Sequence, residues 1–223
     1  MASKSGKNGR ATRRRLLAPQ ERDRARPGSV RIIAGRWRGR RISFPAAADL
    51  RPTPDRVRET LYNWLSGALT GARVLDAFAG SGALGIEALS RGAAAALFIE
   101  SERDVARRLT ETLRELGADT ARVLCADAYE YLDAHATDRF DLVLLDPPFR
   151  TGRLAELCTL LETRGWLAPR AWIYLEHAAT DSVLPLPEHW ERWRETKAGA
   201  VLSTLVRRWT AEPELAPESA PRT

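Results

Sequence analysis

Short apolar runs alternate with amphipathic segments through the middle of the chain. The apolar runs have the length of strands, and in the segments between them apolar residues recur every three or four positions, as in helices. Because the runs are apolar on both faces, the alternation predicts a parallel sheet covered by helices on each side. The predicted strands are 73–78, 95–99, 122–125, 140–145 and 172–176, and the predicted helices are 83–90, 103–116, 129–134 and 154–163.

A hairpin and a helix precede this alternation. Residues 30–33 and 41–44 have the pattern of a short β-hairpin. Thr53 and Pro54 then form a typical helix start, since a threonine hydroxyl can cap a helix and proline suits its first turn. Apolar residues at helical spacing follow until Gly67.

The chain divides into a folded core and two loose ends. Residues 1–28 are basic and poor in apolar residues, so we expect a disordered arm. Residues 29–70 hold the hairpin and helix, and residues 71–210 hold the sheet, which ends in a predicted antiparallel hairpin of 190–196 and 200–209. Residues 211–223 are expected to be a flexible tail. The predicted fold class is α/β, with a mostly parallel seven-stranded sheet.

The charge distribution points to a polyanionic partner. Residues 1–60 carry 17 bases against five acids, whereas the rest of the chain has a net charge of −6. Nucleic acid is the usual partner of such a basic segment, although arginine-rich coding bias is a competing explanation. Two cysteines are too few for a disulfide framework, and no apolar run reaches the length of a membrane span. We therefore expect a cytoplasmic protein that is not bound to a membrane.

The end of the first predicted strand has the pattern of a cofactor loop. Asp76 is followed by Gly80-Ser81-Gly82 and Gly85, a GxGxxG sequence between a strand and a helix. Glycines let the backbone approach a ligand, and the helix start offers free N–H groups. The loop suits the pyrophosphate of a dinucleotide or the methionine and ribose of S-adenosylmethionine. A tight turn without a ligand is the structural alternative.

Acidic residues follow three other predicted strands. Glu100 is placed to accept hydrogen bonds from ribose hydroxyls. Asp127 is placed to receive an adenine amino group or to cap the next helix. Asp146-Pro147-Pro148-Phe149 follows a buried strand, and its prolines leave carbonyl groups free to face a ligand. Acceptors beside the ring of Phe149 suit a planar group that carries an amino function.

The ordered set DAFAGSGALG, Glu100, Asp127 and DPPF resembles class I S-adenosylmethionine-dependent methyltransferases that modify exocyclic amines. With RPTPDRVRETLYNWL and LDAFAGSGALGIEALSRG, residues 30–209 resemble the RsmD family, the bacterial 16S ribosomal RNA guanine-N2 methyltransferases. The resemblance implies a Rossmann-like fold and 16S ribosomal RNA as the partner. We expect a monomer, and the small surface of a compact domain favours RNA presented within an assembling 30S particle. It implies catalytic roles for Asp146, Pro147 and Phe149, and cofactor contacts from Asp76, Phe78, Gly80, Ser81, Gly82, Glu100, Asp127, Ala128 and Thr53.

Six arginines and one tryptophan, most of them in or near the hairpin, are candidate RNA contacts. These are Arg36, Trp37, Arg38, Arg40, Arg41, Arg51 and Arg150, of which Trp37 would stack on a nucleobase. The three histidines lack ligand spacing, so no metal site is expected. A DNA adenine-N6 methyltransferase, which uses a similar acid-Pro-Pro-aromatic motif, is one alternative function. An RNA-binding module without activity is the other.

Overall fold

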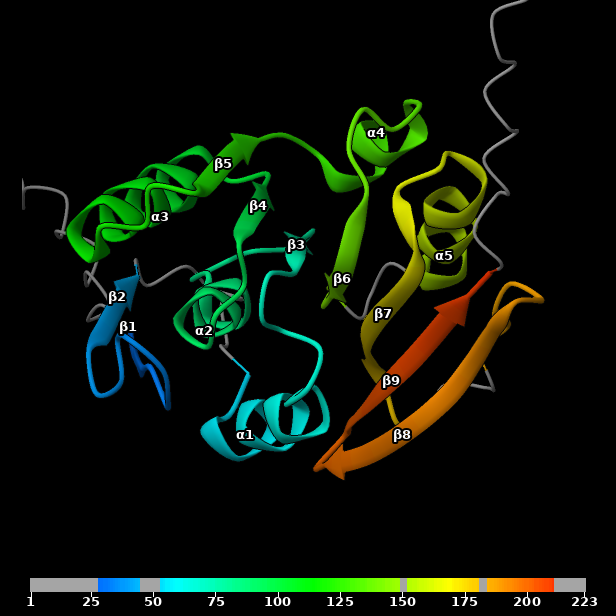
Figure 1. Ribbon diagram of the computed structural model, residues 1–223, viewed down its shortest axis with the longest axis horizontal. Helices are drawn as coiled ribbons and strands as arrows, with labels where there is room; N and C mark the ends of the chain where they lie inside the picture. The colour runs from blue at the N-terminus through cyan, green and yellow to red at the C-terminus, as the bar shows by residue number, and fades with distance from the viewer. Residues whose placement is uncertain (1–27, 45–52, 149–151, 181–183, 211–223) are drawn as a thin grey trace, which may run out of the picture.

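A seven-stranded sheet lies at the centre of the protein in a computed structural model that describes residues 28–44, 53–148, 152–180 and 184–210 (Figure 1). The strand order is β5-β4-β3-β6-β7-β9-β8; the first five are parallel, and β9 is antiparallel to both β7 and β8. The predicted fold class is therefore confirmed. The strands are β3 (Arg73–Asp76), β4 (Ala95–Glu100), β5 (Ala121–Cys125), β6 (Phe140–Leu145), β7 (Leu167–Ala178), β8 (Trp190–Ala198) and β9 (Val201–Trp209).

Helices cover both faces of the sheet, as the apolar runs predict. Neighbouring residues of a strand point to opposite faces, so Val74 packs with α1, α2 and α3 while Leu75 packs with α4 and α5. The two resulting apolar cores sandwich the sheet. The helices are α1 (Asp55–Trp64), α2 (Ala83–Ser90), α3 (Arg103–Leu116), α4 (Ala128–Asp133) and α5 (Leu154–Thr163). Among the described residues, no helix is both long and apolar enough to span a membrane.

The predicted N-terminal hairpin is present as a separate two-stranded sheet of β1 (Gly28–Arg31) and β2 (Arg41–Phe44). It lies beside α2 and α3, at the opposite side of the molecule from β8 and β9 (Figure 1). Its residues Ile32, Trp37 and Ile42 belong to the same apolar core as α2 and α3. The hairpin is therefore packed onto the main domain.

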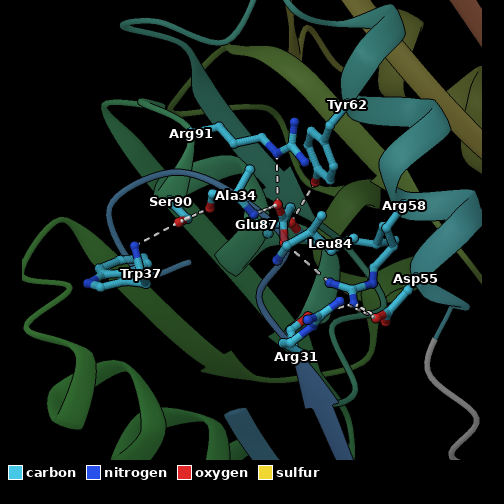
Figure 2. Close-up of polar contacts among 12 residues, drawn as sticks. Arg31, Ala34, Trp37, Asp55, Arg58, Tyr62, Leu84, Glu87, Ser90 and Arg91 are labelled. Carbon is cyan, nitrogen blue, oxygen red and sulfur yellow. Dashed lines mark hydrogen bonds and ion pairs between the residues drawn. The ribbon is translucent and has the colours of Figure 1, made fainter. Parts of the chain in front are cut away.

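A buried ion pair holds the hairpin, α1 and α2 together (Figure 2). Both Arg58 of α1 and Glu87 of α2 have no exposed surface, and Arg58 Nη1 lies 3.4 Å from Glu87 Oε2. Glu87 also accepts hydrogen bonds from the backbone N–H groups of Ile33 and Ala34, at 2.8 and 2.9 Å. Arg58 donates to the carbonyl of Arg31 at 2.7 Å. Arg58 is thus a buried structural residue that joins α1 to α2 and to the hairpin.

One expectation differs from the structure. Thr53 does not cap α1: the cap position is Pro54, and the helix has no side-chain cap. Of the two cysteines, Cys125 is exposed, because β5 is the edge strand of the sheet, whereas Cys158 is buried in α5. The predicted arm, apart from Gly28, and the predicted tail at 211–223 lie outside the described residues and stay predictions.

Replacing Arg58 with alanine is expected to destabilise the protein by roughly 3–5 kcal/mol, because it empties a fully buried position and leaves Arg91 as the remaining cationic partner of the Glu87 carboxylate. Urea denaturation measures the change. The matched control is Arg107→Ala, which removes an exposed arginine paired with Asp104 three residues earlier; it is expected to cost at most about 1 kcal/mol. Equal losses in the two variants would contradict a structural role for the Arg58–Glu87 pair.

Candidate active site

Five carboxylate residues lie at the carboxyl ends of the five parallel strands. In sheet order they are Asp127 after β5, Glu100 in β4, Asp76 in β3, Asp146 after β6 and Glu176 near the end of β7. The chain order reverses between β3 and β6, and a crevice at such a point is where open α/β sheets bind ligands. Asp76 and Asp146 therefore lie on the two sides of the expected binding crevice.

The glycine loop between β3 and α2 adopts conformations that favour glycine. Gly80 and Gly82 have φ angles of 51° and 76°, in the left-handed region. A Cβ atom on Gly82 would meet Leu109 Cδ1 at 2.4 Å, and one on Gly85 would meet Phe98 Cε1 at 2.4 Å. The close packing of α2 on its neighbours thus accounts for glycine at positions 82 and 85 without a ligand. Ser81 is buried beside them.

Glu100 fixes the glycine loop at the neighbouring strand end. Its Oε2 atom accepts a hydrogen bond from the Gly80 N–H at 2.8 Å, and its Oε1 atom accepts one from Glu102 N–H at 2.8 Å. A carboxylate has about four lone-pair sites, so both oxygens retain capacity for a ligand hydroxyl. The strand-end acid and the glycine loop, separated in sequence, form one unit.

Asp127 caps α4. Its Oδ1 atom accepts hydrogen bonds from the backbone N–H groups of Tyr129 and Glu130, at 2.8 and 3.1 Å. The capping role that the sequence allows is therefore realised, and it leaves the adenine role open. Ala128 is buried behind the cap. Phe78 packs edge to face on Tyr129, with a centroid distance of 5.9 Å, and so connects the glycine loop with α4.

Glu176 is a site residue that the sequence analysis did not single out. It is buried, and its Oε1 atom accepts hydrogen bonds from the Tyr174 hydroxyl at 2.6 Å and from the Thr53 hydroxyl at 3.2 Å. The Thr53 hydroxyl thus connects the chain before α1 with the end of β7. The available signal was an acid near the end of an apolar strand, the same signal that identified Asp76 and Glu100.

Burial and mutual repulsion make the central carboxyl groups weak acids. Burial raises the pKa of Asp146 well above its usual range, and the charges of Glu176 and Asp76 raise it further. Burial also raises the pKa of Glu176, although the hydrogen bonds from Tyr174 and Thr53 oppose the change. Because the charge of Glu176 raises the pKa of Asp146, the two carboxyl groups are expected to titrate as an interacting pair.

Asp76 has the same character. Burial raises its pKa to about 7, and the charge of Glu100 adds to the increase, while the Gly85 N–H opposes it. That N–H donates to Asp76 Oδ2 at 2.9 Å, so the carboxyl group is also a fixed support for the start of α2. Asp76 therefore holds the loop in place and acts as a hydrogen-bonding group beside the crevice.

The motif after β6 is described only in part. Pro147 is buried and Pro148 is exposed, and Asp146 is half-buried between Leu145 and these prolines. Phe149, Arg150 and Arg51 lie outside the described residues, so their predicted roles in stacking and RNA binding stay predictions. Among the residues that the structure describes, no group of three or more His, Cys, Asp or Glu side chains is arranged to hold a metal ion.

Two candidate RNA contacts of the hairpin donate hydrogen bonds to carbonyl groups at the C-terminal end of α3. Arg36 Nη2 donates to the carbonyl of Gly117 at 3.3 Å, and Arg40 Nη2 donates to that of Glu115 at 2.9 Å. Arg41 donates to the Ser29 hydroxyl at 2.9 Å. Arg36, Arg38, Arg40 and Arg41 are all exposed, so the surface of the hairpin remains cationic.

Trp37 does not have the exposure that its predicted role requires. Its exposed fraction is 6%, its backbone N–H donates to the Ser90 hydroxyl at 3.1 Å, and the Arg36 guanidinium covers the ring at 3.9 Å. The ring packs the hairpin on α2 because it is the large apolar residue of the connecting loop. It has no free face for a nucleobase, and we remove it from the candidate RNA contacts.

Known proteins share this arrangement over most of the chain. The family model described as Conserved hypothetical protein 95 matches residues 30–207. The Ribosomal RNA small subunit methyltransferase D of Escherichia coli strain K12 is 48% identical over 181 residues, which cover 81% of this chain and 91% of the relative. The protein of the same name from Haemophilus influenzae is 42% identical over 177 residues, which cover 78% and 91%.

A solved structure agrees with these relatives. The yhhF protein from Escherichia coli matches with a TM-score of 0.77 and 44% identity, covering 82% of this chain and 99% of that chain. The match confirms the Rossmann-like methyltransferase fold that the ordered strand-end motifs imply. Together with the family model, the sequence relatives establish the assignment: the chain belongs to the RsmD family of methyltransferases.

Proposed function

We propose that the protein transfers a methyl group from S-adenosylmethionine to the exocyclic N2 amine of one guanine in 16S ribosomal RNA. The observation that carries the proposal is the position of Asp146 and Pro147 beside Asp76 and the glycine loop, at the point where the strand order reverses. The names of the relatives from Escherichia coli and Haemophilus influenzae support ribosomal RNA as the substrate.

The residues present fit S-adenosylmethionine. That cofactor supplies an activated methyl group on a sulfonium cation. Glu100 is expected to accept hydrogen bonds from its ribose hydroxyls, with Phe78, Ser81 and Ala128 around it and Asp127 near the adenine. Carboxylates along the strand ends favour a cationic ligand, and Thr53, held by Glu176 at 3.2 Å, closes the side of the site next to α1.

Asp146 would make the substrate amine reactive. The lone pair of guanine N2 is delocalised into the ring, so the nitrogen is a poor nucleophile. Hydrogen bonds from N2 to the Asp146 carboxylate and the Pro147 carbonyl favour a nitrogen whose lone pair faces the methyl group. As the N–C bond forms and the S–C bond breaks, N2 releases one proton. Asp146, with its raised pKa, takes that proton or passes it to water.

The substrate would enter as an extruded nucleotide. A guanine amine inside a helix is out of reach of the donor, so the base must leave its stack, and Phe149 is the proposed stacking partner. A compact domain has little surface with which to read sequence, which favours recognition of the shape of an assembling 30S particle. In this proposal the protein acts as a monomer in the cytoplasm, where that particle is assembled.

Methyl transfer to ribosomal RNA and DNA tests the function. Labelled donor is supplied with 30S subunits, naked 16S RNA or duplex DNA from a strain that lacks the gene, and nucleosides are analysed. We expect N2-methylguanine in RNA, and Asp146→Ala is expected to reduce transfer roughly a hundredfold through loss of a transition-state hydrogen bond. Labelled N6-methyladenine in DNA would favour the DNA methyltransferase, and RNA binding without transfer to any substrate would favour the inactive module.

Loss of the Glu100 carboxylate is expected to weaken binding of S-adenosylmethionine by roughly 1–3 kcal/mol, since hydrogen bonds to a charged acceptor are removed. Calorimetry of Glu100→Ala measures the change. Glu102→Ala, at the exposed neighbouring acid, serves as the control and should bind normally. Saturable binding of NAD by the unchanged protein, with none of S-adenosylmethionine, would refute the cofactor assignment.

The pH dependence of methyl transfer is expected to report the pair of Asp146 and Glu176. Asp146 accepts a hydrogen bond from the amine only when ionised, so activity falls as pH drops through its raised pKa. Glu176→Gln removes a charge that raises this pKa while an amide oxygen remains for Tyr174 and Thr53. The acidic limb of the profile should therefore move to lower pH.

The control for this shift is Glu59→Gln, which removes an exposed acid of α1 and should leave the profile in place. An acidic limb that is unchanged in Glu176→Gln, or that moves to higher pH, would show that Glu176 does not act on Asp146.

A further inference from the structure

Exposed tryptophans gather on β8 and β9, far from the hairpin that the sequence analysis associates with RNA (Figure 1). Trp193 is 42% exposed and Trp209 is 51% exposed. Both rings contact Trp172 of β7 edge to face, with centroid distances of 6.2 and 6.1 Å. Because large exposed apolar clusters mark interaction sites on protein surfaces, the cluster of Trp172, Trp193 and Trp209 indicates a binding surface.

Arginines alternate with these rings. The Arg207 guanidinium lies over the rings of both Trp193 and Trp209, at 4.3 and 4.6 Å from their centroids. Glu191 holds it in place through a hydrogen bond of 2.7 Å to Nε. Arg170 is exposed and pairs with Trp209 across β7 and β9, and it makes no ion pair within the part of the chain that the structure describes. The cluster is therefore both aromatic and cationic.

A hollow adjoins the cluster. Its volume is about 330 Å³, Trp172 and Trp209 form one wall, and the turn at Thr70 forms another. Arg170 and Asp141 complete the lining. Flat rings with a few polar groups are the surroundings that a nucleobase requires, since stacking supplies the affinity and polar groups orient the base.

A second hollow lies between α1 and β8, and we call the line along which these two elements meet the seam. Its volume is about 240 Å³, and its cationic residues are Arg56 of α1 and Lys197 of β8. Neither makes an ion pair among the described residues. Both side chains are exposed and therefore available to phosphate groups.

The seam connects the active-site end of the sheet with the tryptophans. Lys197 and His177 both pair with Leu202 of β9, so Lys197 lies level with the end of β7, with β9 between the two strands. Trp193 is four residues earlier on β8, which is about 13 Å at 3.3 Å per residue. Trp172 and Glu176 point to the same face of β7, the face that α1 covers.

We propose that the seam between α1 and β8 binds a single-stranded segment of the substrate RNA that flanks the target nucleotide. Arg56 and Lys197 contact phosphates near the active site, and Trp193 and Trp209 stack on bases further along. This inference rests on the proposed function, because it assigns a surface to its substrate. A single strand of RNA carries phosphates and bases at regular intervals, which suits cationic side chains that alternate with aromatic rings. A protein partner would have to supply acidic side chains at matching positions.

Affinity of the full-length protein for 30S subunits and for 16S RNA tests the inference. We expect Trp193→Ala and Trp209→Ala each to weaken binding about tenfold, and Trp193→Phe to retain most of the affinity because a ring remains. Arg56→Ala and Lys197→Ala should reduce the salt dependence of binding. Arg107→Ala, at an exposed arginine of α3, is the matched control.

Binding of S-adenosylmethionine should be unchanged in all of these variants, and thermal denaturation checks their folding. Unchanged RNA affinity in folded Trp193→Ala and Trp209→Ala would overturn the inference. So would a dimer that sedimentation detects in the unchanged protein and not in these variants, because the tryptophans would then bind a second copy.

Photo-crosslinking separates failure of this inference from failure of the proposed function. It detects contact with RNA whether or not a methyl group is transferred. We expect crosslinked peptides to include residues 190–209. Crosslinks confined to residues 28–44 would overturn the seam as an RNA site, while absence of N2-methylguanine alongside crosslinks at 190–209 would overturn only the proposed reaction.

Discussion

Burial of carboxyl groups at the strand ends is the constraint on which the site depends. Parallel strands bring Asp76, Asp146 and Glu176 to one edge of the sheet, where burial disfavours their charged forms. Two of these groups are held by hydrogen-bond donors: Asp76 by the start of α2, and Glu176 by Tyr174 and Thr53. The result is a set of carboxyl groups with raised pKa values, which favours groups that both accept a hydrogen bond and exchange a proton.

The Arg58–Glu87 pair connects the elements around the site with the N-terminal hairpin. Arg58 fixes α1 on α2, and the chain that enters α1 carries Thr53 to Glu176. Glu87 also binds the backbone of the hairpin at Ile33 and Ala34. A single buried carboxylate therefore joins the N-terminal hairpin and both helices, so that the surface of the hairpin and the site keep a fixed relation.

The sequence predicted most of the fold because its signals are local. The apolar run at 140–145 and the helix closed by Gly117 match β6 and α3 in the structure, and Gly117 has the positive φ angle of 65° expected at a helix end. Trp37 and Thr53 were misinterpreted because their roles depend on partners far along the chain. Trp37, which stands among exposed arginines, is buried by tertiary packing, and so is Arg58; periodicity does not report such burial.

In the proposed function, the row of strand-end carboxylates forms the methyl-donor site, with Asp146 facing the reacting centre. A crystal structure of the protein with S-adenosylhomocysteine tests this arrangement most directly. We expect ribose hydroxyls within hydrogen-bond distance of Glu100 and a sulfur atom that faces the space beside Asp146. A ligand bound away from the crevice between β3 and β6, or a ribose without contact to Glu100, would contradict it.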